Sequence, residues 1–287
     1  MRTSRKLLSV TRPMCHATST CHVARPRERV AIACGRTLSL VAGDMARASW
    51  LATALLALSP SAAALTIGGV RTKRVQPSPE LPWVIEADWQ TSTGTGAIRQ
   101  HDPLSSCYWP AAAALARLVH RLGADDTPRQ SFLDLGCGTG LCSLTAAACG
   151  ALSVIATDVS ETSLEFTSAA ADAQGLSAVQ TRLFDATALD APLPAADVLM
   201  LSDVFVTDAL ATAFAARVAE AEKASFARVL IVDPGRSTRD VFLAALDAHG
   251  VQHDGFADEA TCLRRARAGA RVLCLDTSEG APVSYCI

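Results

Sequence analysis

At residues 131–140 the chain reads SFLDLGCGTG, an apolar segment that runs into three glycines at alternate positions. Glycines let the backbone turn sharply and let a ligand lie against the main chain, because no Cβ is in the way. The helix that we expect from Leu141 onward would offer unpaired N–H groups in its first turn. This stretch therefore predicts a strand, a ligand-binding turn and a helix.

The spacing of the glycines excludes two common nucleotide-binding motifs. Leu141 stands where the third glycine of the dinucleotide pattern G-x-G-x-x-G belongs, and the chain contains no P-loop signature. We therefore expect neither an NAD-dependent oxidoreductase nor a P-loop nucleotide triphosphatase.

Beyond this stretch, short apolar strands alternate with helices. We expect strands at 131–135, 152–157, 179–184, 196–201, 228–232 and 270–275, with a weaker one near 251–256. We expect helices at 110–122, 141–149, 160–174, 208–223 and 237–250. Buried strands that alternate with helices indicate parallel βαβ units. The predicted fold class is α/β: a Rossmann-like, doubly wound sheet of about seven strands, mostly parallel with an antiparallel last strand, in three αβα layers.

Acidic residues follow two more of the expected strands. Asp158 closes the second strand and Asp185 closes the third. In such sheets ligands bind beyond the carboxyl ends of the strands, where one carboxylate can accept both ribose hydroxyls and another can accept the adenine amine. Each aspartate alone could be an ordinary turn residue. Together with Asp134 and the glycine turn, they indicate a nucleoside-containing ligand.

Charge divides the chain into a basic leader and an acidic body. Residues 1–74 hold twelve Lys or Arg and two acids, whereas the remaining residues hold 14 basic and 26 acidic side chains. A basic, acid-poor start that is rich in Ser and Thr is typical of a targeting segment. We therefore expect residues 1–75 to be a targeting leader, 76–108 an N-terminal arm and 109–287 the folded domain.

A second interpretation of the leader begins at Met45, which could also be the true start. A basic residue, an apolar run and then small residues follow it, and this order is typical of a secretory signal peptide. The apolar run from Trp50 to Leu65 is short and contains Pro60, so we expect no stable membrane span.

Composition limits the remaining function classes. The net charge of −2 argues against a nucleic-acid partner. The ten cysteines show neither a C-x-x-C pair nor a Cys/His cluster with zinc spacing, so we expect free thiols and no metal site. Free thiols are typical of a reducing interior such as a mitochondrial matrix or a plastid stroma.

Four segments together resemble one enzyme family. Residues 132–158 resemble the nucleotide-binding core of the class I, seven-β-strand S-adenosylmethionine-dependent methyltransferases. Residues 108–111, YWPA, are similar to the Trp-Pro signature of the protein-lysine methyltransferases in that class, and 202–205, SDVF, are similar to their Asp-centred motif after the fourth strand. Residues 228–236, RVLIVDPGR, resemble the electron-transfer-flavoprotein β-subunit lysine methyltransferases and their bacterial relatives.

The resemblance implies S-adenosyl-L-methionine as the cofactor. It implies a cofactor-binding set of Trp109, Asp134, Gly136, Cys137, Gly138, Asp158, Asp185, Ala186 and Ser202. In this set the glycines would lie under the methionine part, with Asp134 holding the turn or reaching the amine through water. Asp158 would bind the ribose, while Asp185 and the Ala186 N–H would bind the adenine. Trp109 would line the pocket, although it could equally be a core tryptophan.

The resemblance also implies an acceptor site with Asp203 and Phe205 as catalytic residues. Asp203 would face the acceptor nitrogen, but it could instead cap the following helix. The family pattern has an aromatic residue where this chain has Val206, so Phe205 would have to supply the aromatic wall. Residues 233–236 would shape the rim of the acceptor channel, or form a rigid turn in which Arg236 pairs with a neighbouring acid.

The function that follows is a protein-lysine N-methyltransferase that modifies the ε-amine of an organellar protein, in the mitochondrion first and the plastid second. Two alternatives remain open: a methyltransferase for a small molecule or a ribosomal protein, and a non-catalytic assembly factor that binds the cofactor. The expected partner is the substrate protein that carries the target lysine, and we expect the enzyme to be a monomer.

Overall fold

The computed structural model describes residues 65–67, 69–88, 106–122, 129–224 and 226–278. All of them belong to the second of two compact units of the chain, Gly43–Ile287. Residues 1–64 of the predicted leader, with the signal-like segment after Met45, and residues 89–105 of the predicted N-terminal arm lie outside the described residues.

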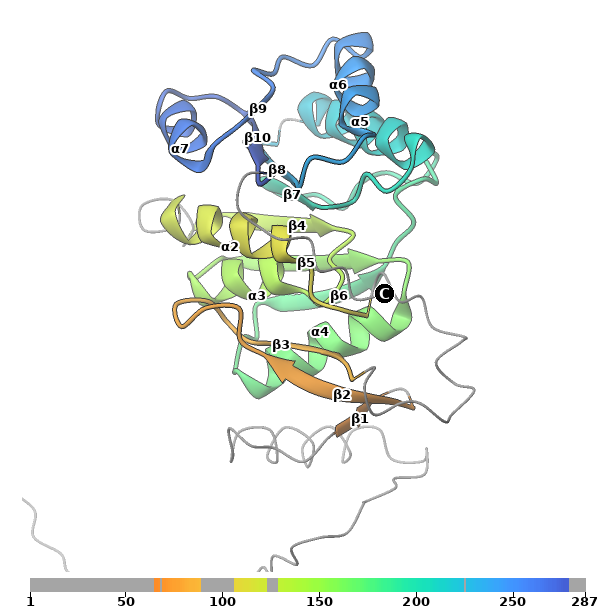
Figure 1. Ribbon diagram of the computed structural model, residues 1–287, viewed down its shortest axis with the longest axis vertical. Coiled ribbons are helices and arrows are strands. Elements are labelled where there is room, and N and C mark those ends of the chain that lie inside the picture. Colours follow the sequence, from red (N-terminus) through yellow and green to blue (C-terminus); the bar gives the residue numbers. More distant parts are fainter. Residues whose placement is uncertain (1–64, 68, 89–105, 123–128, 225, 279–287) are drawn as a thin grey trace, which may run out of the picture. The chain divides into compact units, whose positions relative to one another are not determined.

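A seven-stranded parallel sheet is the centre of this unit (Figure 1). In spatial order its strands are β6 (Val179–Leu183), β5 (Ser153–Asp158), β4 (Ser131–Leu135), β7 (Val198–Ser202), β8 (Arg228–Asp233), β10 (Val272–Asp276) and β9 (Phe256–Ala257). The chain moves outward from β4 to β6 and then returns to β7 on the other side of β4. The order therefore reverses between β4 and β7, which is where ligands of doubly wound sheets bind. The predicted α/β Rossmann-like fold is confirmed.

One detail of the sheet differs from the prediction. The last described strand, β10, pairs with β8 and β9 in parallel, not antiparallel, orientation. The reason is helix α7 (Glu259–Arg267), which the sequence analysis did not predict and which returns the chain to the same end of the sheet. Asp258 caps this helix by accepting a hydrogen bond from the Thr261 N–H at 3.0 Å.

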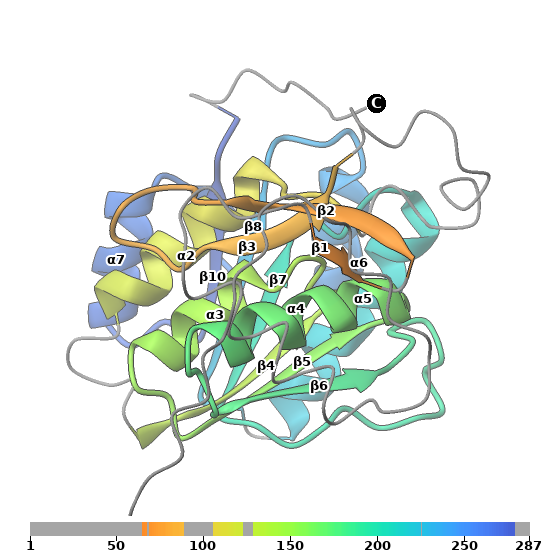
Figure 2. The ribbon, with the colours of Figure 1, turned by 90° about the horizontal axis from the view of Figure 1, so that it is seen from below.

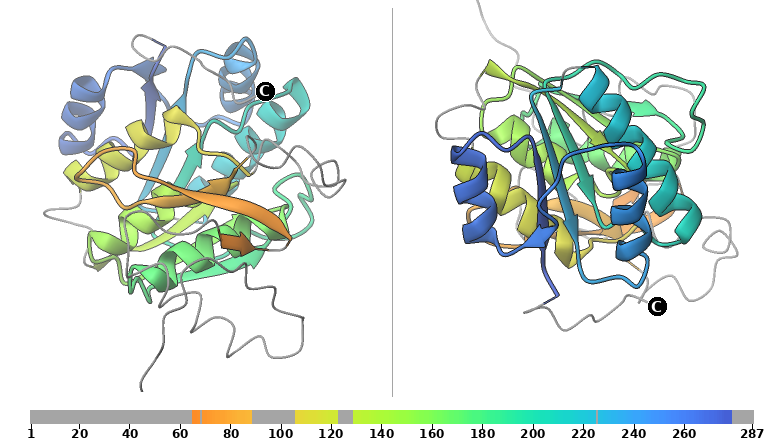
Figure 3. Two further views of the ribbon diagram at one scale, coloured as in Figure 1. Left: turned by 60° about the horizontal axis from the view of Figure 1, so that its bottom comes forward. Right: turned by 90° about the horizontal axis from the view of Figure 1, so that it is seen from above.

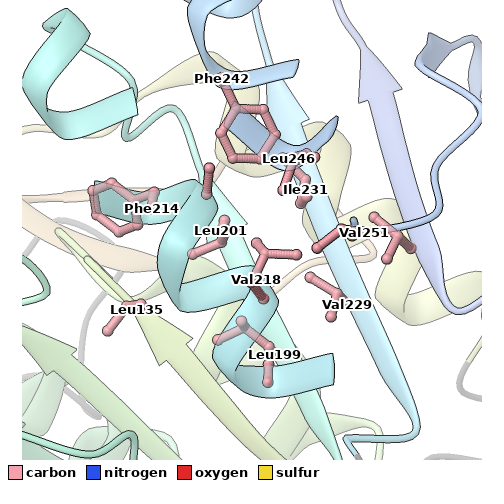
Figure 4. Close-up of a cluster of buried hydrophobic side chains, with 14 of the residues drawn as sticks. Leu135, Leu199, Leu201, Phe214, Val218, Val229, Ile231, Phe242, Leu246 and Val251 are labelled. Carbon is pink, nitrogen blue, oxygen red and sulfur yellow. The ribbon is translucent and has the colours of Figure 1, made fainter. Parts of the chain in front are cut away.

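Helices cover both faces of the sheet. They are α2 (Pro110–Leu122), α3 (Leu141–Ala148), α4 (Glu161–Ala173), α5 (Asp208–Lys223), α6 (Arg239–Ala248) and α7. Helices α5 and α6 lie side by side (Figure 3, right) and pack on the face formed by alternate residues of β4, β7 and β8. Figure 4 shows Leu199, Leu201, Val218, Val229 and Ile231 in this layer. Helices α2, α3 and α7 pack on the opposite face of the same strands, which gives the expected three layers.

A small antiparallel sheet precedes the main one. It consists of β1 (Leu65–Ile67), β2 (Val70–Val75) and β3 (Val84–Ala87), and it lies beside α4 (Figures 1 and 2). The buried residues Val84 and Ile85 share a hydrophobic cluster with Phe166 of α4. Residues 65–67 and 69–75 thus belong to the described fold.

The predicted leader boundary at residue 75 is therefore wrong, because residues 65–75 belong to the fold. Three of the twelve cations counted as leader lie on β2, where buried and exposed positions alternate. Arg71 is exposed, Lys73 forms an ion pair with Glu86 at 3.0 Å, and the Arg74 guanidinium lies 4.4 Å from the centre of the Trp83 ring. Exposed cations on a strand look like targeting charge in the sequence, since only the pairing of β2 reveals their alternation.

Among the described residues, no helix has the length and apolar character needed to cross a membrane.

Candidate functional site

The glycine turn at the end of β4 has the geometry that its sequence predicts. Gly136, Gly138 and Gly140 have φ angles of 78°, 53° and 77°, a region that side chains rarely adopt. A Cβ on Gly140 would lie 2.4 Å from Cγ2 of Thr167, whereas a Cβ on Gly138 would meet nothing within 4 Å. The third glycine is thus needed for packing, and the second borders open space at the carboxyl ends of the strands.

Main-chain hydrogen bonds join this turn to the end of β5. The N–H groups of Gly136 and Cys137 donate to the Thr157 carbonyl at 2.9 and 2.8 Å. The Gly138 N–H donates to Oδ2 of Asp158 at 2.9 Å, and the Ser160 N–H donates to Oδ1 at 2.9 Å. Asp158 thus joins the glycine turn to the start of α4 at the carboxyl end of β5.

Asp134 is a buried carboxyl directly before the turn. Its Oδ2 accepts hydrogen bonds from the Ser143 N–H at 3.1 Å and the Ser143 hydroxyl at 2.7 Å. Its Oδ1 is buried without a partner among the described residues. Burial raises the pKa of Asp134 to about 6, with Ser143 opposing the shift and the charge of Asp158 adding to it. Since orphaned buried acceptors are rare in proteins, this oxygen is suited to a donor from a ligand.

The loop after β6 presents a donor and an acceptor side by side. Oδ1 of Asp185 accepts hydrogen bonds from the Thr187 hydroxyl at 2.7 Å and the Thr187 N–H at 2.8 Å, and these bonds lower the pKa of Asp185. The next residue, Ala186, is buried, yet its N–H donates to no described residue. The loop therefore offers a carboxylate oxygen next to an unused N–H.

Asp203 follows β7 with a strained backbone. Its φ of 56° is the single positive value of a non-glycine residue in the described part of the chain. Its side chain is buried, and Oδ1 accepts a hydrogen bond from Nε of Arg236 at 2.5 Å. Burial raises the pKa of Asp203, with the Arg236 guanidinium opposing the shift. The interpretation of Asp203 as a helix cap is wrong, because Thr207 caps α5 and accepts a hydrogen bond from the Leu210 N–H at 3.2 Å.

The residues after Asp203 bring this segment against the glycine turn. Cγ1 of Val204 lies 3.0 Å from the position that a Cβ of Gly136 would occupy. The first glycine is thus covered by the segment that carries Asp203. The turn after β7 therefore lies beside the turn after β4, across the point where the strand order reverses.

The prediction that Phe205 forms an aromatic wall is wrong. Its side chain is fully buried, with the ring stacked on Phe242 at 4.1 Å and in edge contact with Phe214 at 6.3 Å. Figure 4 shows both of these partners among the core side chains. The Thr238 hydroxyl donates to the Phe205 carbonyl, so the backbone of Phe205 is held as well. Because α5 and α6 cover this face of the sheet, the ring points into the core rather than into a channel.

Residues 233–236 form a rigid turn, which was the alternative to a channel rim. Oδ1 of the fully buried Asp233 accepts the N–H groups of Gly235 at 2.8 Å and Arg236 at 2.9 Å, and also Nε of Arg239 at 2.9 Å. Arg239 in turn binds both carboxylate oxygens of Asp276, at 3.0 and 3.1 Å. Burial opposes ionisation of Asp276, but Arg239 and Ser278 lower its pKa to about 2.

Sequence reasoning missed Arg239 and Asp276. A signal existed, because an aspartate ends or follows each of five strands of the sheet. These are Asp158, Asp185, Asp203, Asp233 and Asp276. The pairing with Arg239 joins segments 37 residues apart, and no local pattern reveals it. The helix expected at 237–250 begins later, since α6 starts after Thr238, whose hydroxyl donates to the Phe205 carbonyl.

The other predicted site residues have these positions. Trp109 precedes α2, is partly buried and accepts a hydrogen bond from the Ala112 N–H at 3.0 Å. Cys137 is partly buried in the glycine turn, and burial raises the pKa of its thiol. Ser202 ends β7 and is partly buried. The structure thus assembles the glycine turn, Asp158 and the Asp203 segment through direct contacts, and it removes Phe205 from the site.

Residues 132–224 match the protein family described as Methyltransferase domain. The matched segment contains the glycine turn and the carboxylates after β5, β6 and β7. This part of the chain is a methyltransferase domain. Its cofactor is S-adenosyl-L-methionine, as the resemblance implied. No curated protein matches the sequence.

Several solved structures are similar to parts of this chain. A proposed RNA methyltransferase of Pyrococcus horikoshii has 18% identity and a TM-score of 0.39, over 49% of this chain and 67% of that chain. A TehB-like SAM-dependent methyltransferase of Corynebacterium glutamicum has 18% identity and a TM-score of 0.37, over 47% and 71%. The cyclase SpnF has 21% identity and a TM-score of 0.37, over 51% and 59%. The similarity thus spans only part of each protein.

The residues of the methyltransferase domain fit its cofactor. Gly138 carries no side chain that would fill the space above the turn. The orphaned Oδ1 of Asp134 is an acceptor for an amine or a bridging water, and Asp158 places a carboxylate, which accepts hydrogen bonds from hydroxyls, directly beside the glycine turn. The Ala186 N–H and the Asp185 carboxylate match the acceptor and donor on one edge of adenine.

Proposed function

We propose that this chain is a protein-lysine N-methyltransferase in which Asp203 positions the acceptor amine. The observation that carries the proposal is the position of Val204, whose Cγ1 lies 3.0 Å from the place that a Cβ of Gly136 would occupy, beside the first glycine of the cofactor turn. It supports an acceptor site directly beside the methionine part of the cofactor, with a buried carboxylate as its neighbour. In the same proposal Asp158 binds the ribose, Asp185 with Ala186 binds the adenine, and Trp109, Cys137 and Ser202 line the cofactor site.

The surroundings of Asp203 suit an amine acceptor. Arg236 holds Oδ1 at 2.5 Å, while no described residue donates to Oδ2. One oxygen is thus fixed in direction and the other is free to accept an N–H of the incoming amine. The positive φ of Asp203 turns the chain at the end of β7, so the segment runs back toward the glycine turn rather than directly into α5.

When bound, S-adenosylmethionine would supply a methyl group on a sulfonium: an uncharged amine would attack the methyl carbon in line, the C–S bond would break and S-adenosylhomocysteine would leave. A free lysine has a pKa of about 10.4 and must lose a proton first. Burial next to the glycine turn lowers the pKa of an amine, while Asp203 orients it. Because burial raises the pKa of the Asp203 carboxyl, this group accepts a proton more readily than an exposed aspartate does. Alignment of the amine accounts for the rest of the catalysis in this proposal.

The test is methyl transfer by the full chain from tritiated S-adenosylmethionine into a protein extract. The proposal expects label on the Nε atom of lysine, located by mass spectrometry of the labelled protein. Acetylation of the extract's lysines before the assay should abolish the label, and ribonuclease treatment should leave it unchanged. Label that persists after acetylation or disappears with ribonuclease would refute the lysine acceptor. Cofactor binding without transfer to any extract would favour the non-catalytic assembly factor.

We further propose that the substrate is organellar, with the mitochondrion ahead of the plastid. Support comes from the residues before Leu65, which hold nine of the twelve cations of the predicted leader and its two acids. The test is a fluorescent fusion to residues 1–64, with a second fusion to residues 45–64. Import by the first fusion supports the proposal. Secretion of either fusion would favour the signal peptide after Met45, and a cytosolic signal would refute both.

A further inference from the structure

The side chain of Arg217, in α5, lies under the loop that follows β6 and has no exposed surface. Its Nε donates to the Ala186 carbonyl at 2.9 Å, and its Nη2 donates to the Ala188 carbonyl at 2.7 Å. Nη1 donates to the Ala191 carbonyl at 2.8 Å. One guanidinium thus holds three main-chain carbonyls of a single loop, and it reaches across 26 to 31 residues of sequence to do so.

Glu220, one turn further along α5, completes this arrangement. Its Oε2 accepts a hydrogen bond from Nη1 of Arg217 at 2.6 Å, and its Oε1 accepts one from the Leu193 N–H at 2.7 Å. The centre of the Phe184 ring lies 5.2 Å from the guanidinium carbon. A buried cation is costly unless it is paired and fully hydrogen-bonded. The guanidinium and Glu220 both form hydrogen bonds to the backbone of the loop at residues 184–193. The free-energy cost of burying Arg217 is therefore offset only while this loop keeps its conformation.

The loop after β6, which Arg217 holds, also contains two polar groups that bond to no described residue. The Ala186 carbonyl is tied to Arg217, while the N–H of the same buried residue donates to no described residue. Oδ1 of Asp185 is held by Thr187, while no described residue donates to Oδ2. Buried N–H groups are nearly always paired in proteins. An unpaired N–H beside an available carboxylate oxygen therefore indicates a ligand with an acceptor next to a donor.

Adenine carries this pattern, because its N1 accepts and its 6-amino group donates a hydrogen bond. Hypoxanthine carries the reverse, since N1 is protonated and a carbonyl replaces the amine. We infer that Arg217 is a positioning residue that makes this domain selective for adenine in its cofactor, by holding Asp185 and Ala186 in the required geometry. The inference rests on the proposed function, because it requires the adenine to lie at this loop.

The test compares two ligands on the full chain by calorimetry: S-adenosylhomocysteine and S-inosylhomocysteine. Two mismatched hydrogen-bonding groups should make wild type prefer the adenine compound by about 10- to 100-fold. Arg217→Met should lose most of this preference and bind S-adenosylhomocysteine more weakly, with a raised KM for the cofactor and little change in kcat. Arg217→Lys keeps the positive charge but loses the planar guanidinium with its several N–H donors, so it should show an intermediate preference.

Arg271→Met is the matched control. Arg271 also donates to main-chain carbonyls, those of Phe226 at 2.6 Å and Glu222 at 3.4 Å, and it pairs with Glu222 at 3.6 Å. It acts at the C-terminal end of α5 and not on residues 184–193, so Arg271→Met should lower the melting temperature without changing the preference between the two ligands. Hydrogen exchange of amides 186–193 should accelerate in Arg217→Met and stay unchanged in Arg271→Met.

The outcomes separate this inference from the proposed function. A folded Arg217→Met protein that keeps the wild-type preference would overturn the inference and leave the proposed function intact. If Arg217→Met does not fold, Glu220→Gln takes its place, since it weakens the same arrangement from the other side. Wild type that binds S-adenosylhomocysteine without discrimination would also overturn the inference. Wild type that binds neither compound would overturn the proposed function, and the inference with it.

Discussion

The two halves of the main sheet hold their carboxylates in different ways. On the side of β4, β5 and β6, Asp134, Asp158 and Asp185 accept hydrogen bonds from main-chain N–H groups and from the hydroxyls of Ser143 and Thr187. On the side of β7, β8 and β10, three other aspartates bind guanidinium groups. They are Asp203, Asp233 and Asp276, and their partners are Arg236 and Arg239.

This difference shows how each half is built. In the first half, the main-chain N–H donors belong to the segments that follow the strands. The backbone therefore holds these carboxylates in place without a ligand. The arginines come from one short segment at the start of α6 and reach three different strands. The second half is therefore a charge network, in which removing one member leaves buried charge behind. A substitution in one half therefore tests whether the other half responds.

The largest expected effect is the loss of Arg239. Arg239→Met leaves the fully buried Asp233 without its guanidinium and Asp276 without its bidentate partner. Breaking a buried pair typically costs about 3–5 kcal/mol, and partial exposure of Asp276 argues for the lower end. Chemical denaturation should show this loss, and Arg239→Lys should show a smaller one. A loss below about 1 kcal/mol would mean that the N–H groups of the 233–236 turn suffice for Asp233.

Asp203→Asn tests the acceptor half without touching the cofactor half. It removes the charge that orients the amine, so kcat should fall about 10- to 1000-fold, which corresponds to roughly 1.4–4 kcal/mol. The affinity for S-adenosylhomocysteine should stay close to that of wild type. Turnover, cofactor affinity and melting temperature are measured on the same preparation. Unchanged turnover with a lower melting temperature would assign Asp203 a structural role through Arg236.

Asp158→Ala is the converse change in the cofactor half. It removes the acceptor proposed for the ribose, the hydrogen bond from the Gly138 N–H that holds the glycine turn and the hydrogen bond from the Ser160 N–H at the start of α4. Cofactor affinity should fall by roughly 1.5–3 kcal/mol, the range for hydrogen bonds to a charged group. At saturating cofactor, kcat should change much less. If kcat falls as much as affinity does, the two halves are coupled through Val204 rather than independent.

The raised pKa of Asp134 predicts a stability that falls as the pH rises, which is opposite to the contribution of an aspartate with a lowered pKa. The pKa of Asp134 is raised to about 6 in the fold, so the folded state binds more protons than the unfolded state between about pH 4 and 6, and stability falls as pH rises through this window. Comparison with Asp134→Asn isolates this contribution, which is roughly 2–3 kcal/mol for a shift of about two units. Asp185, whose pKa is lowered, has the opposite sign: its contribution is lost as pH falls below about 4. Identical pH curves for wild type and Asp134→Asn would show that Asp134 titrates normally.

Much of the cofactor half could be predicted from the sequence, because its signals are local. The glycine turn, the capped start of α4 at Ser160 and the aspartates after β5 and β6 lie within a few residues of the strands that present them. Backbone geometry at Gly136 and Gly138 follows from the residue type, since few other residues adopt these φ angles. The alternation of strands and helices sets the parallel order, and with it the edge where these groups meet.

The features that the sequence did not reveal depend on partners distant in the chain. Arg71, Lys73 and Arg74 looked like targeting charge until the pairing of β2 with β3 put them on a folded strand. Phe205 has the right residue type for an acceptor wall, but packing against Phe242 in α6 turns it into the core. Arg217 and Arg239 look like ordinary helix-surface cations, and only the loop and strands that they reach show what they hold.

The sequence by itself thus determined the sheet, the glycine turn and the carboxylates around it, because backbone preferences and the hydrophobic pattern depend on residues that are close together in the sequence. The tertiary structure alone decided which side chains pair across the sheet edge and which are buried. A charged or aromatic side chain is several bonds long and can point to the core, to solvent or to a partner. Its direction is set by the free energy of burial and by the charges that surround it, and these are known only once distant segments are packed together.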